Sequence, residues 1–239
     1  MFEWLASPEA WIALGTLTAL EIVLGIDNII FISILVARLP PEQREKARRI
    51  GIMLAMVTRL ALLFSISWVM GLTEPWFVVF GEEISGRDLI LIVGGLFLLA
   101  KSTHEIHSSV EGEAEESNVS TAAASMGMIL VQIAILDIVF SLDSVITAVG
   151  LVDHVSIMAI AIIIAVGIMM WSAKSIGEFV DDHPTIKVLA LSFLIVVGIT
   201  LMAEGLDVHV PKGYIYFAML FSLSVEMINI RMRKKQSAK

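Results

Sequence analysis

The sequence predicts an all-α membrane protein with seven transmembrane helices, and three observations support this. Of its 239 residues, 57% are hydrophobic and only 17% are charged, whereas a soluble domain has about 25% charged residues. Seven stretches are long and apolar enough to cross a bilayer, which takes about 20 residues. An acidic motif in the first stretch recurs in the fourth. The composition argues against a soluble enzyme, and the recurrence indicates internal symmetry.

The predicted spans follow one another along almost the whole chain. They cover residues 11–37, 50–71, 88–104, 124–150, 155–174, 187–205 and 212–230. The first lacks a basic start and is too long for a cleavable signal peptide. An acidic segment, 105–123, is interpreted as a cytoplasmic linker between two three-helix repeats, 1–104 and 124–205. A metal-sampling role of His104, Glu105 and His107 in that segment is the less favoured interpretation. Residues 206–239 form the seventh helix and a basic tail.

Basic residues predict the orientation of the spans. Thirteen of the sixteen Lys and Arg residues fall on one side of the predicted membrane, chiefly within 38–49 and 231–239. Arg87 and Lys212 fall on the other side, and Arg59 lies inside the second span. Because basic loops stay in the cytoplasm, we expect the N-terminus outside and the C-terminus in the cytoplasm. The net charge of −8 leaves no basic face for nucleic acid.

The acidic motif is repeated with its charges in register. Residues 20–30 are LEIVLGIDNII and residues 136–146 are LDIVFSLDSVI, so Glu21 matches Asp137 and Asp27 matches Asp143. Three predicted spans separate the two starts, so the copies cross the membrane in opposite directions. This pattern is typical of the inverted repeats of secondary transporters, whose site lies near the midplane. We therefore expect an inverted 3+3 repeat, with the seventh helix outside it.

Four intramembrane carboxylates need a functional explanation. Each costs about 2.5–3.5 kcal/mol at the centre of the bilayer, unless water, a proton or a cation compensates. On a straight helix, residues six apart point about 120° away from each other. We therefore expect the first helix of each repeat to be broken, near Gly25 and near Ser141, so that backbone carbonyls add to the ligands. The alternative is an unbroken helix whose acids pair with Arg59 and Lys174.

The donor atoms of the two motifs are all oxygens, which Mg²⁺, Ca²⁺ and Mn²⁺ prefer. The candidate metal ligands are Glu21, Asp27, Asn28, Asp137, Asp143 and Ser144. Gln132, about one turn before Asp137, and Arg59 are candidate supporting residues, although Gln132 is equally compatible with a hydrogen bond between helices. Four carboxylates around one divalent ion leave a net charge of −2. Proton binding when the ion leaves is therefore a hypothesis for coupling.

The same residues carry a family resemblance. The segments LEIVLGIDNIIF and LDIVFSLDSVITAVG resemble the paired signatures of the TerC family of integral membrane proteins. RDLILIVGGLFL and VPKGYIYFAMLFSLSVE are similar to its bacterial branch, so the resemblance covers nearly the whole chain. It implies the LysE-like transporter superfamily, an inverted three-plus-three core, the bacterial inner membrane and manganese efflux. It also implies that both motifs contribute to the site.

These observations predict an inner-membrane exporter of divalent metal ions, above all Mn²⁺, that works by alternating access and is not an enzyme. The expected partners are the transported metal and the lipid bilayer, with a possible homo-oligomer, and no cofactor is expected. One alternative is a membrane partner for the assembly or metal loading of exported proteins. A less favoured one is an intramembrane aspartyl protease using Asp27 and Asp143, because the GxGD pattern is missing around Asp27. The choice of ion, the proton coupling, the oligomeric state and the number of sites stay open.

Overall fold

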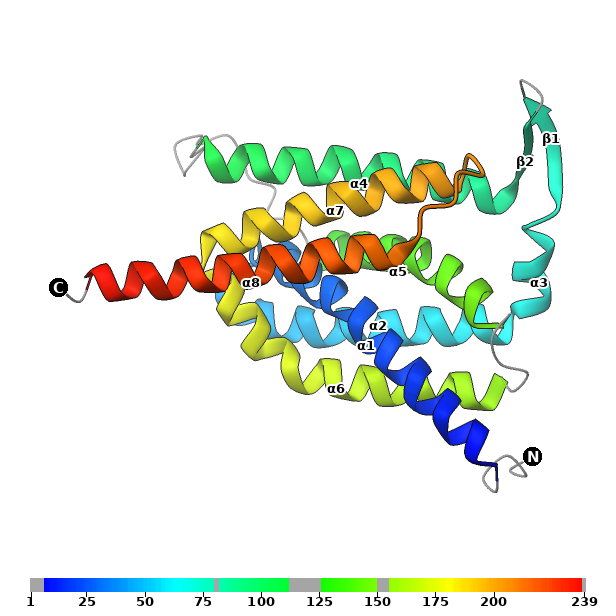
Figure 1. The fold of residues 1–239 in the computed structure, drawn as a ribbon, viewed down its shortest axis with the longest axis horizontal. Helices are drawn as coiled ribbons and strands as arrows, with labels where there is room; N and C mark the ends of the chain where they lie inside the picture. Colours follow the sequence, from blue (N-terminus) through cyan, green and yellow to red (C-terminus); the bar gives the residue numbers. More distant parts are fainter. Residues whose placement is uncertain (1–6, 80–81, 112–125, 150–154, 238–239) are drawn as a thin grey trace. The chain divides into compact units, whose positions relative to one another are not determined.

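The computed structural model describes residues 7–79, 82–111, 126–149 and 155–237, which are almost entirely helical (Figure 1). Within these ranges some side chains are left undescribed, namely those of Leu24, Asp27, Val79, Glu82, Asp143, Thr147, Ala148, Val149 and Ser237. The chain divides into two compact units. The first comprises Met1–Arg87 and Asn118–Phe179, and the second comprises Asp88–Ser117 and Val180–Lys239.

The first unit contains the two acidic motifs. Its elements are α1 (Pro8–Val36), α2 (Pro41–Phe64), α3 (Ile66–Gly71), β1 (Pro75–Val79), β2 (Glu82–Ser85), α5 (Met126–Val149) and most of α6 (Val155–Asp182). Proline in the first turn favours the starts of α1 and α2, since its missing N–H has no helical partner there. At the start of α1, the Ser7 hydroxyl also accepts a hydrogen bond from the Ala10 backbone N–H. The first motif therefore lies inside a long helix that begins at a clear sequence signal.

The described part of the second unit contains helices and no strand. It holds most of α4 (Gly86–Val110), α7 (Pro184–Glu204) and α8 (Lys212–Ser237). Helices α4 and α7 cross closely at two glycines: a Cβ atom on Gly95 would lie 2.5 Å from the Gly198 backbone oxygen. After α7 the chain turns through Asp207, whose φ of 58° is in the left-handed region. The small residues at the crossing bring the two backbones together, as is common between membrane helices.

Six of the helices in the described part of the chain are long and apolar enough to cross a membrane. They are Pro8–Val36, Gly86–Val110, Met126–Ile146, Val155–Asp182, Pro184–Glu204 and Lys212–Gln236. These correspond to six of the seven predicted spans. The remaining one, 50–71, coincides with the end of α2 and with α3, and Ser65 separates the two helices. Helix α2 is less apolar because Arg48, Arg49 and Arg59 lie within it.

The prediction of a broken first helix in each repeat is wrong. Both α1 and α5 are continuous α-helices through 24–26 and 140–142. Gly25 serves close packing instead, since a Cβ atom there would lie 2.1 Å from the Met169 sulfur of α6. At Ser141 the backbone oxygen accepts a bond from the Ser144 hydroxyl at 3.1 Å, a local contact that a continuous helix allows.

Two connections differ from the expectation. Strands β1 and β2 pair in antiparallel fashion, with Phe77 opposite Ile84 and Val78 opposite Glu83. The apolar run of β1 was not predicted as a strand because it is short and adjoins a span. The first part of the predicted linker is helical, since α4 continues to Val110, and Glu105 within it is buried and paired with Lys101 at 3.1 Å. The rest of the linker, 112–123, lies outside the described residues.

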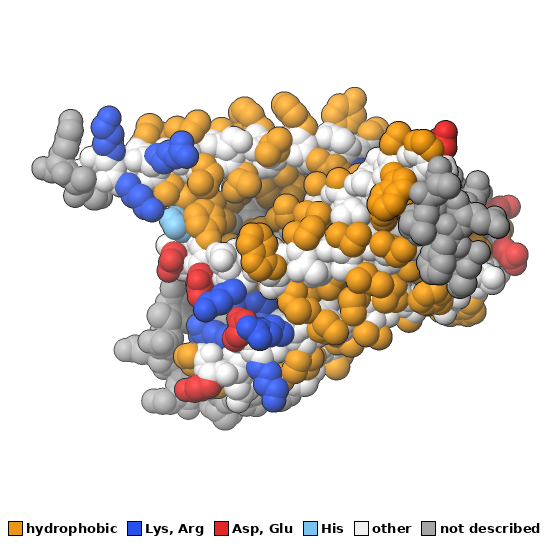
Figure 2. Space-filling model, turned by 90° about the horizontal axis from the view of Figure 1, so that it is seen from below, with side chains coloured by type: hydrophobic (Ala, Val, Ile, Leu, Met, Phe, Trp, Pro, Cys, Tyr) orange, Lys and Arg blue, Asp and Glu red, His pale blue; other side chains and the backbone are white. Residues whose placement is uncertain are grey.

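Apolar side chains are abundant on the surface. Hydrophobic side chains are spread over much of the face drawn in Figure 2, and Lys and Arg side chains gather there in a few groups. Trp171 on α6 is 85% exposed, for example. Such exposure suits lipid-facing positions, since lipid tails are as apolar as these side chains.

Candidate functional site

Two acids from the repeated motifs bind one arginine. Arg59 of α2 donates through Nη1 to a carboxylate oxygen of Glu21 on α1 and through Nε to Asp137 Oδ1 on α5 at 3.1 Å. The exposed fractions of the three side chains are 4% for Arg59, 3% for Asp137 and 12% for Glu21. Removing such charges from water costs several kcal/mol unless they are paired and hydrogen-bonded. The cluster therefore gathers the matched acids of both motifs around a single cation.

Thr58 completes the surroundings of Asp137. Its hydroxyl donates to Asp137 Oδ2 at 2.5 Å, so both carboxylate oxygens have a donor. The same hydroxyl oxygen lies 2.9 Å from the Ala55 backbone oxygen and 3.1 Å from that of Leu54. A hydroxyl has one proton to donate. Thr58 can thus donate either to the carboxylate or to its own helix.

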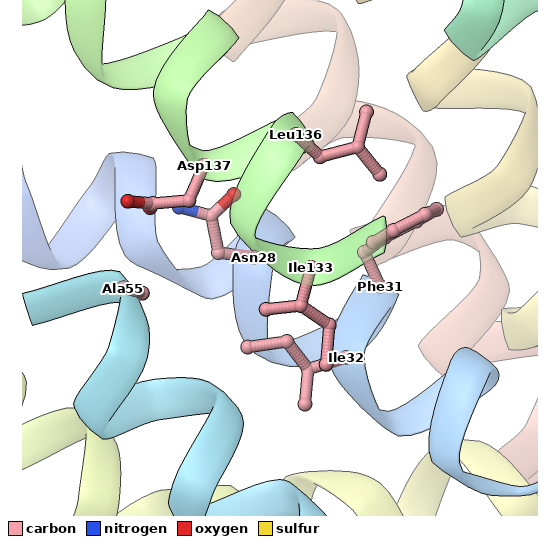
Figure 3. A pocket seen from close by; sticks show the side chains of 7 residues that line it. All are labelled: Asn28, Phe31, Ile32, Ala55, Ile133, Leu136 and Asp137. Carbon is pink, nitrogen blue, oxygen red and sulfur yellow. The ribbon is translucent and has the colours of Figure 1, made fainter. Parts of the chain in front are cut away.

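A small pocket opens beside this cluster (Figure 3). Its lining residues come from α1, α2 and α5: Asn28, Phe31, Ile32, Ala55, Ile133, Leu136 and Asp137. Its volume is about 10 Å³, room for roughly one water-sized sphere. Figure 3 shows the Asn28 amide and the Asp137 carboxylate next to each other, with apolar side chains making up the other walls. The polar edge of the pocket thus consists of one predicted ligand from each motif.

The remaining predicted site residues are placed differently. Asp27 and Asp143 lie in α1 and α5, but their side chains are outside the part that the structure describes. Ser144 is half-buried and its hydroxyl bonds within α5. Gln132 is half-buried on α5 and is not among the lining residues of the pocket. The alternative interpretation paired Lys174 with an intramembrane acid. Its Nζ atom instead lies 3.8 Å from Oε1 of Glu178, on the same helix.

The described part of the site is an ion-pair cluster without an assembled metal centre. Among the described side chains, which omit Asp27 and Asp143, no group of three or more His, Asp or Glu side chains is placed to hold a metal ion. With both acids ionised, Arg59, Glu21 and Asp137 carry a net charge of −1. Together with Asn28 and Thr58, the cluster provides carboxylate, amide and hydroxyl oxygens, the donors that suit hard divalent cations.

Thr58 was missed at the sequence level, although a signal for it existed. It stands next to Arg59 in the otherwise apolar run IGIMLAMVTRLALLF, at 50–64. A lone polar pair in such a run marks the helix face that meets other polar groups. The carboxylates of the repeat pointed to α1 and α5, whereas α2 supplies the donors of all three hydrogen bonds to these acids.

Known proteins resemble the chain over almost its whole length. The model of the integral membrane protein TerC family matches residues 6–239. A UPF0053 protein of Haemophilus influenzae is 63% identical over 98% of this chain and 99% of its own length. The UPF0053 inner membrane protein YgdQ of Escherichia coli is 61% identical over 98% of both chains. The inner membrane protein YoaE of Escherichia coli is 50% identical over 95% of this chain, but the match covers 44% of YoaE.

No solved structure matches the chain. The names of the relatives and the six apolar helices support a multi-pass protein of the inner membrane. The match to the family model covers almost the whole sequence, including both acidic motifs. The resemblance found in those motifs is therefore confirmed: the chain belongs to the TerC family of integral membrane proteins.

Proposed function

We propose that this protein is a transporter that exports divalent metal ions, with Mn²⁺ as the favoured substrate, across the inner membrane by alternating access. The observation that carries the proposal is the convergence of Glu21 and Asp137 on Arg59. Acids inside a membrane-spanning protein mark ion paths and proton relays, and they face the protein interior. These two hold matching places in the motifs and meet beside a pocket with further oxygen donors.

The proposal includes an inverted repeat, which the arrangement of the first unit supports. Helices α1 and α5 run in opposite directions in Figure 1. Helix α1 contacts α6 where Gly25 meets Met169, and α5 contacts α2 where Ile133 meets Gly51. In the proposed repeat α2 and α6 are equivalent, so the first helix of each half touches the second helix of the other, although α1 also packs against α2 of its own half. This exchange is expected of halves that rock against each other around a shared site.

Helix α2 is proposed as the seventh span. Its first residues, 41–49, are rich in polar and basic side chains, as suits a cytoplasmic end, and residues 50–64 are apolar except at Thr58 and Arg59. Both of these side chains bind Asp137, and Arg59 also binds Glu21, so the charge inside the span is compensated. With α2 counted, the N-terminus lies outside and the C-terminus in the cytoplasm, in agreement with the basic loops.

Asp27, Asn28, Asp143 and Ser144 are proposed as metal ligands alongside the two paired acids. Moving a doubly charged ion outward opposes a negative-inside potential by about 4.6 kcal/mol per 100 mV. Export therefore needs a coupled inward movement of charge, and protons returning to the vacated carboxylates would supply it. Membership of the LysE-like superfamily, implied by the resemblance, accords with this scheme.

Purified protein in proteoliposomes tests the proposal. A fluorophore quenched by Mn²⁺ is enclosed in the vesicles, and the rate of Mn²⁺ entry is recorded for wild type, Asp27→Asn and Asp143→Asn. Glu178→Gln is the matched control, because it removes an exposed carboxylate of α6. We expect flux with wild type and the control, and at least a tenfold loss with either motif variant. Wild-type vesicles that match empty vesicles for Mn²⁺, Ca²⁺ and Mg²⁺ would refute the proposal.

A further inference from the structure

We infer that Arg59 is a tethered counter-cation of the metal site: it neutralises Glu21 and Asp137 while no metal is bound, and an arriving divalent cation displaces it. This inference rests on the proposed function and assigns a role to a residue of α2 that neither motif contains. The first support is the geometry. Two different nitrogens of one guanidinium hold two acids that lie 116 positions apart and match in the repeat.

The second support is that α6, the proposed equivalent of α2, carries no counterpart of Arg59. The only basic residue of α6 is Lys174, which is exposed and lies near Glu178. Glu21 and Asp137 occupy matching positions in the two halves, but their counter-ion, Arg59, comes from the first half alone. Arginine suits this task because its charge is permanent and its donors form a rigid fork. One fixed charge therefore serves the acids of both halves when the substrate is absent.

The third support is charge balance. Glu21 and Asp137 carry −2 when ionised, Arg59 returns +1, and a divalent ion returns +2. The metal and the guanidinium need the same carboxylate oxygens, so they compete for them. Two like charges within a few ångströms repel by about 1 kcal/mol even at the dielectric constant of water, and by more in a buried site. An arginine that stays near the loaded site would therefore favour release of the metal.

Thr58 provides the corresponding change of hydrogen bonding. In the structure its hydroxyl donates to Asp137 Oδ2, while the Ala55 backbone oxygen lies 2.9 Å away as a second acceptor. If the proton turns to Ala55, Thr58 offers a lone pair where it had offered a proton. Asp137 then loses the hydrogen bond from Thr58 on Oδ2 and the one from Arg59 on Oδ1, so both oxygens can bind the metal. The pocket beside Asn28 and Asp137 gives the ion its place of entry.

Metal binding to the purified protein in lipid nanodiscs tests the inference, with Mn²⁺ as the titrant in isothermal calorimetry. Removing a competitor that occupies the site most of the time raises the apparent affinity in proportion. We expect Arg59→Gln to bind Mn²⁺ about tenfold more tightly than wild type. The same variant should transport Mn²⁺ more slowly in proteoliposomes, because release loses its repelling charge. Equal or weaker binding by Arg59→Gln would overturn the inference.

A second variant covers the case in which Arg59→Gln does not fold, judged by gel filtration. Arg59→Lys keeps the positive charge but has one nitrogen, so it cannot hold both carboxylates in the same way. Its Mn²⁺ affinity should rise about threefold, between wild type and full removal of the competitor, and an unchanged or lower affinity contradicts the inference. If wild type transports Mn²⁺ and both variants bind Mn²⁺ less tightly than wild type, only the role of Arg59 is refuted. If wild type neither binds nor transports Mn²⁺, the proposed function and this inference are both refuted.

Discussion

Glu21 and Asp137 hold matching positions in the two acidic motifs and are ion-paired with the same side chain, that of Arg59. The sequence relates these acids by an offset of 116 residues, and the fold relates them by a shared guanidinium. Because Arg59 belongs to α2, the pairing connects three helices of the first unit, α1, α2 and α5. The stability of this unit and its proposed transport are therefore both expected to depend on the cluster.

Asp137→Asn should destabilise the protein. The change keeps the shape of the side chain and an acceptor for Thr58, but it leaves Arg59 with Glu21 as its only described charge partner. Breaking a buried pair costs about 3–5 kcal/mol, and we expect the lower end because Glu21 remains. For a chain of this size such a loss lowers the denaturation temperature by roughly 6–12 °C, measurable by fluorescence-detected gel filtration after heating.

Glu178→Gln is the control for Asp137→Asn. Lys174 and Glu178 are 64% and 61% exposed, so their pair should contribute no more than about 1 kcal/mol. The denaturation temperature of Glu178→Gln should stay close to that of wild type. Equal losses in both variants would show that the buried cluster is no more important for stability than a surface pair.

Gly25→Ala tests the continuity of α1. In wild type the new Cβ atom would lie 2.1 Å from the Met169 sulfur, so Gly25→Ala should lower the denaturation temperature. A Met169→Ala background removes the three atoms nearest to that Cβ position, and alanine in a continuous helix is about 1 kcal/mol better than glycine. Gly25→Ala should therefore stabilise the Met169→Ala protein. If it destabilises that background as well, Gly25 is needed for a break in the helix and the continuous α1 is wrong.

Gly95→Ala should separate α4 from α7. Its Cβ atom would lie 2.5 Å from the Gly198 backbone oxygen, an atom that moves only with its helix. Forced overpacking of this kind costs about 1–3 kcal/mol. Gly167→Ala in α6 is the control, because nothing lies within 4 Å of its Cβ position, and it should be neutral or stabilising by about 0.5–1 kcal/mol. Melting curves of the Gly95→Ala and Gly167→Ala proteins in the same detergent test this prediction. Identical curves for the two variants would contradict the close crossing of α4 and α7.

Single-cysteine labelling can establish whether α2 crosses the membrane. The chain has no cysteine, so each introduced thiol is unique. Gln43, near the start of α2, and Thr73, just after α3, are both exposed. If α2 spans the membrane, an impermeant maleimide added to spheroplasts should label Thr73→Cys and leave Gln43→Cys unlabelled until the cells are lysed. Labelling of both positions from the same side would remove α2 from the spans.

The helices could be predicted from the sequence because bilayer thickness and backbone hydrogen bonding leave few alternatives. Six of the seven predicted stretches coincide with apolar helices. The antiparallel pair of β1 and β2 escaped prediction, since both strands are short and β1 adjoins a predicted span. The helical start of the linker was also missed, because the pairing of Lys101 with Glu105 within α4 outweighs the polar composition.

The site was predicted in part. The repeat identified Glu21 and Asp137, and Arg59 was foreseen as a supporting residue and as the partner of acids in unbroken helices. The break at Gly25 was inferred because the acids of one helix cannot converge alone. The fold solves this problem with a third helix, α2, which brings Arg59 and Thr58 to Asp137. Such a contact between distant segments depends on packing, which the period of a single helix does not reveal.

The central claim is metal export through a site built from both motifs, and cellular manganese tests it most directly. Elemental analysis would compare a bacterial strain lacking its own TerC-family proteins with the same strain producing wild type, Asp27→Asn or Asp143→Asn at equal membrane levels. Wild type is expected to lower the manganese content, and neither variant should do so. Equal manganese, calcium and magnesium in all four strains would contradict the claim.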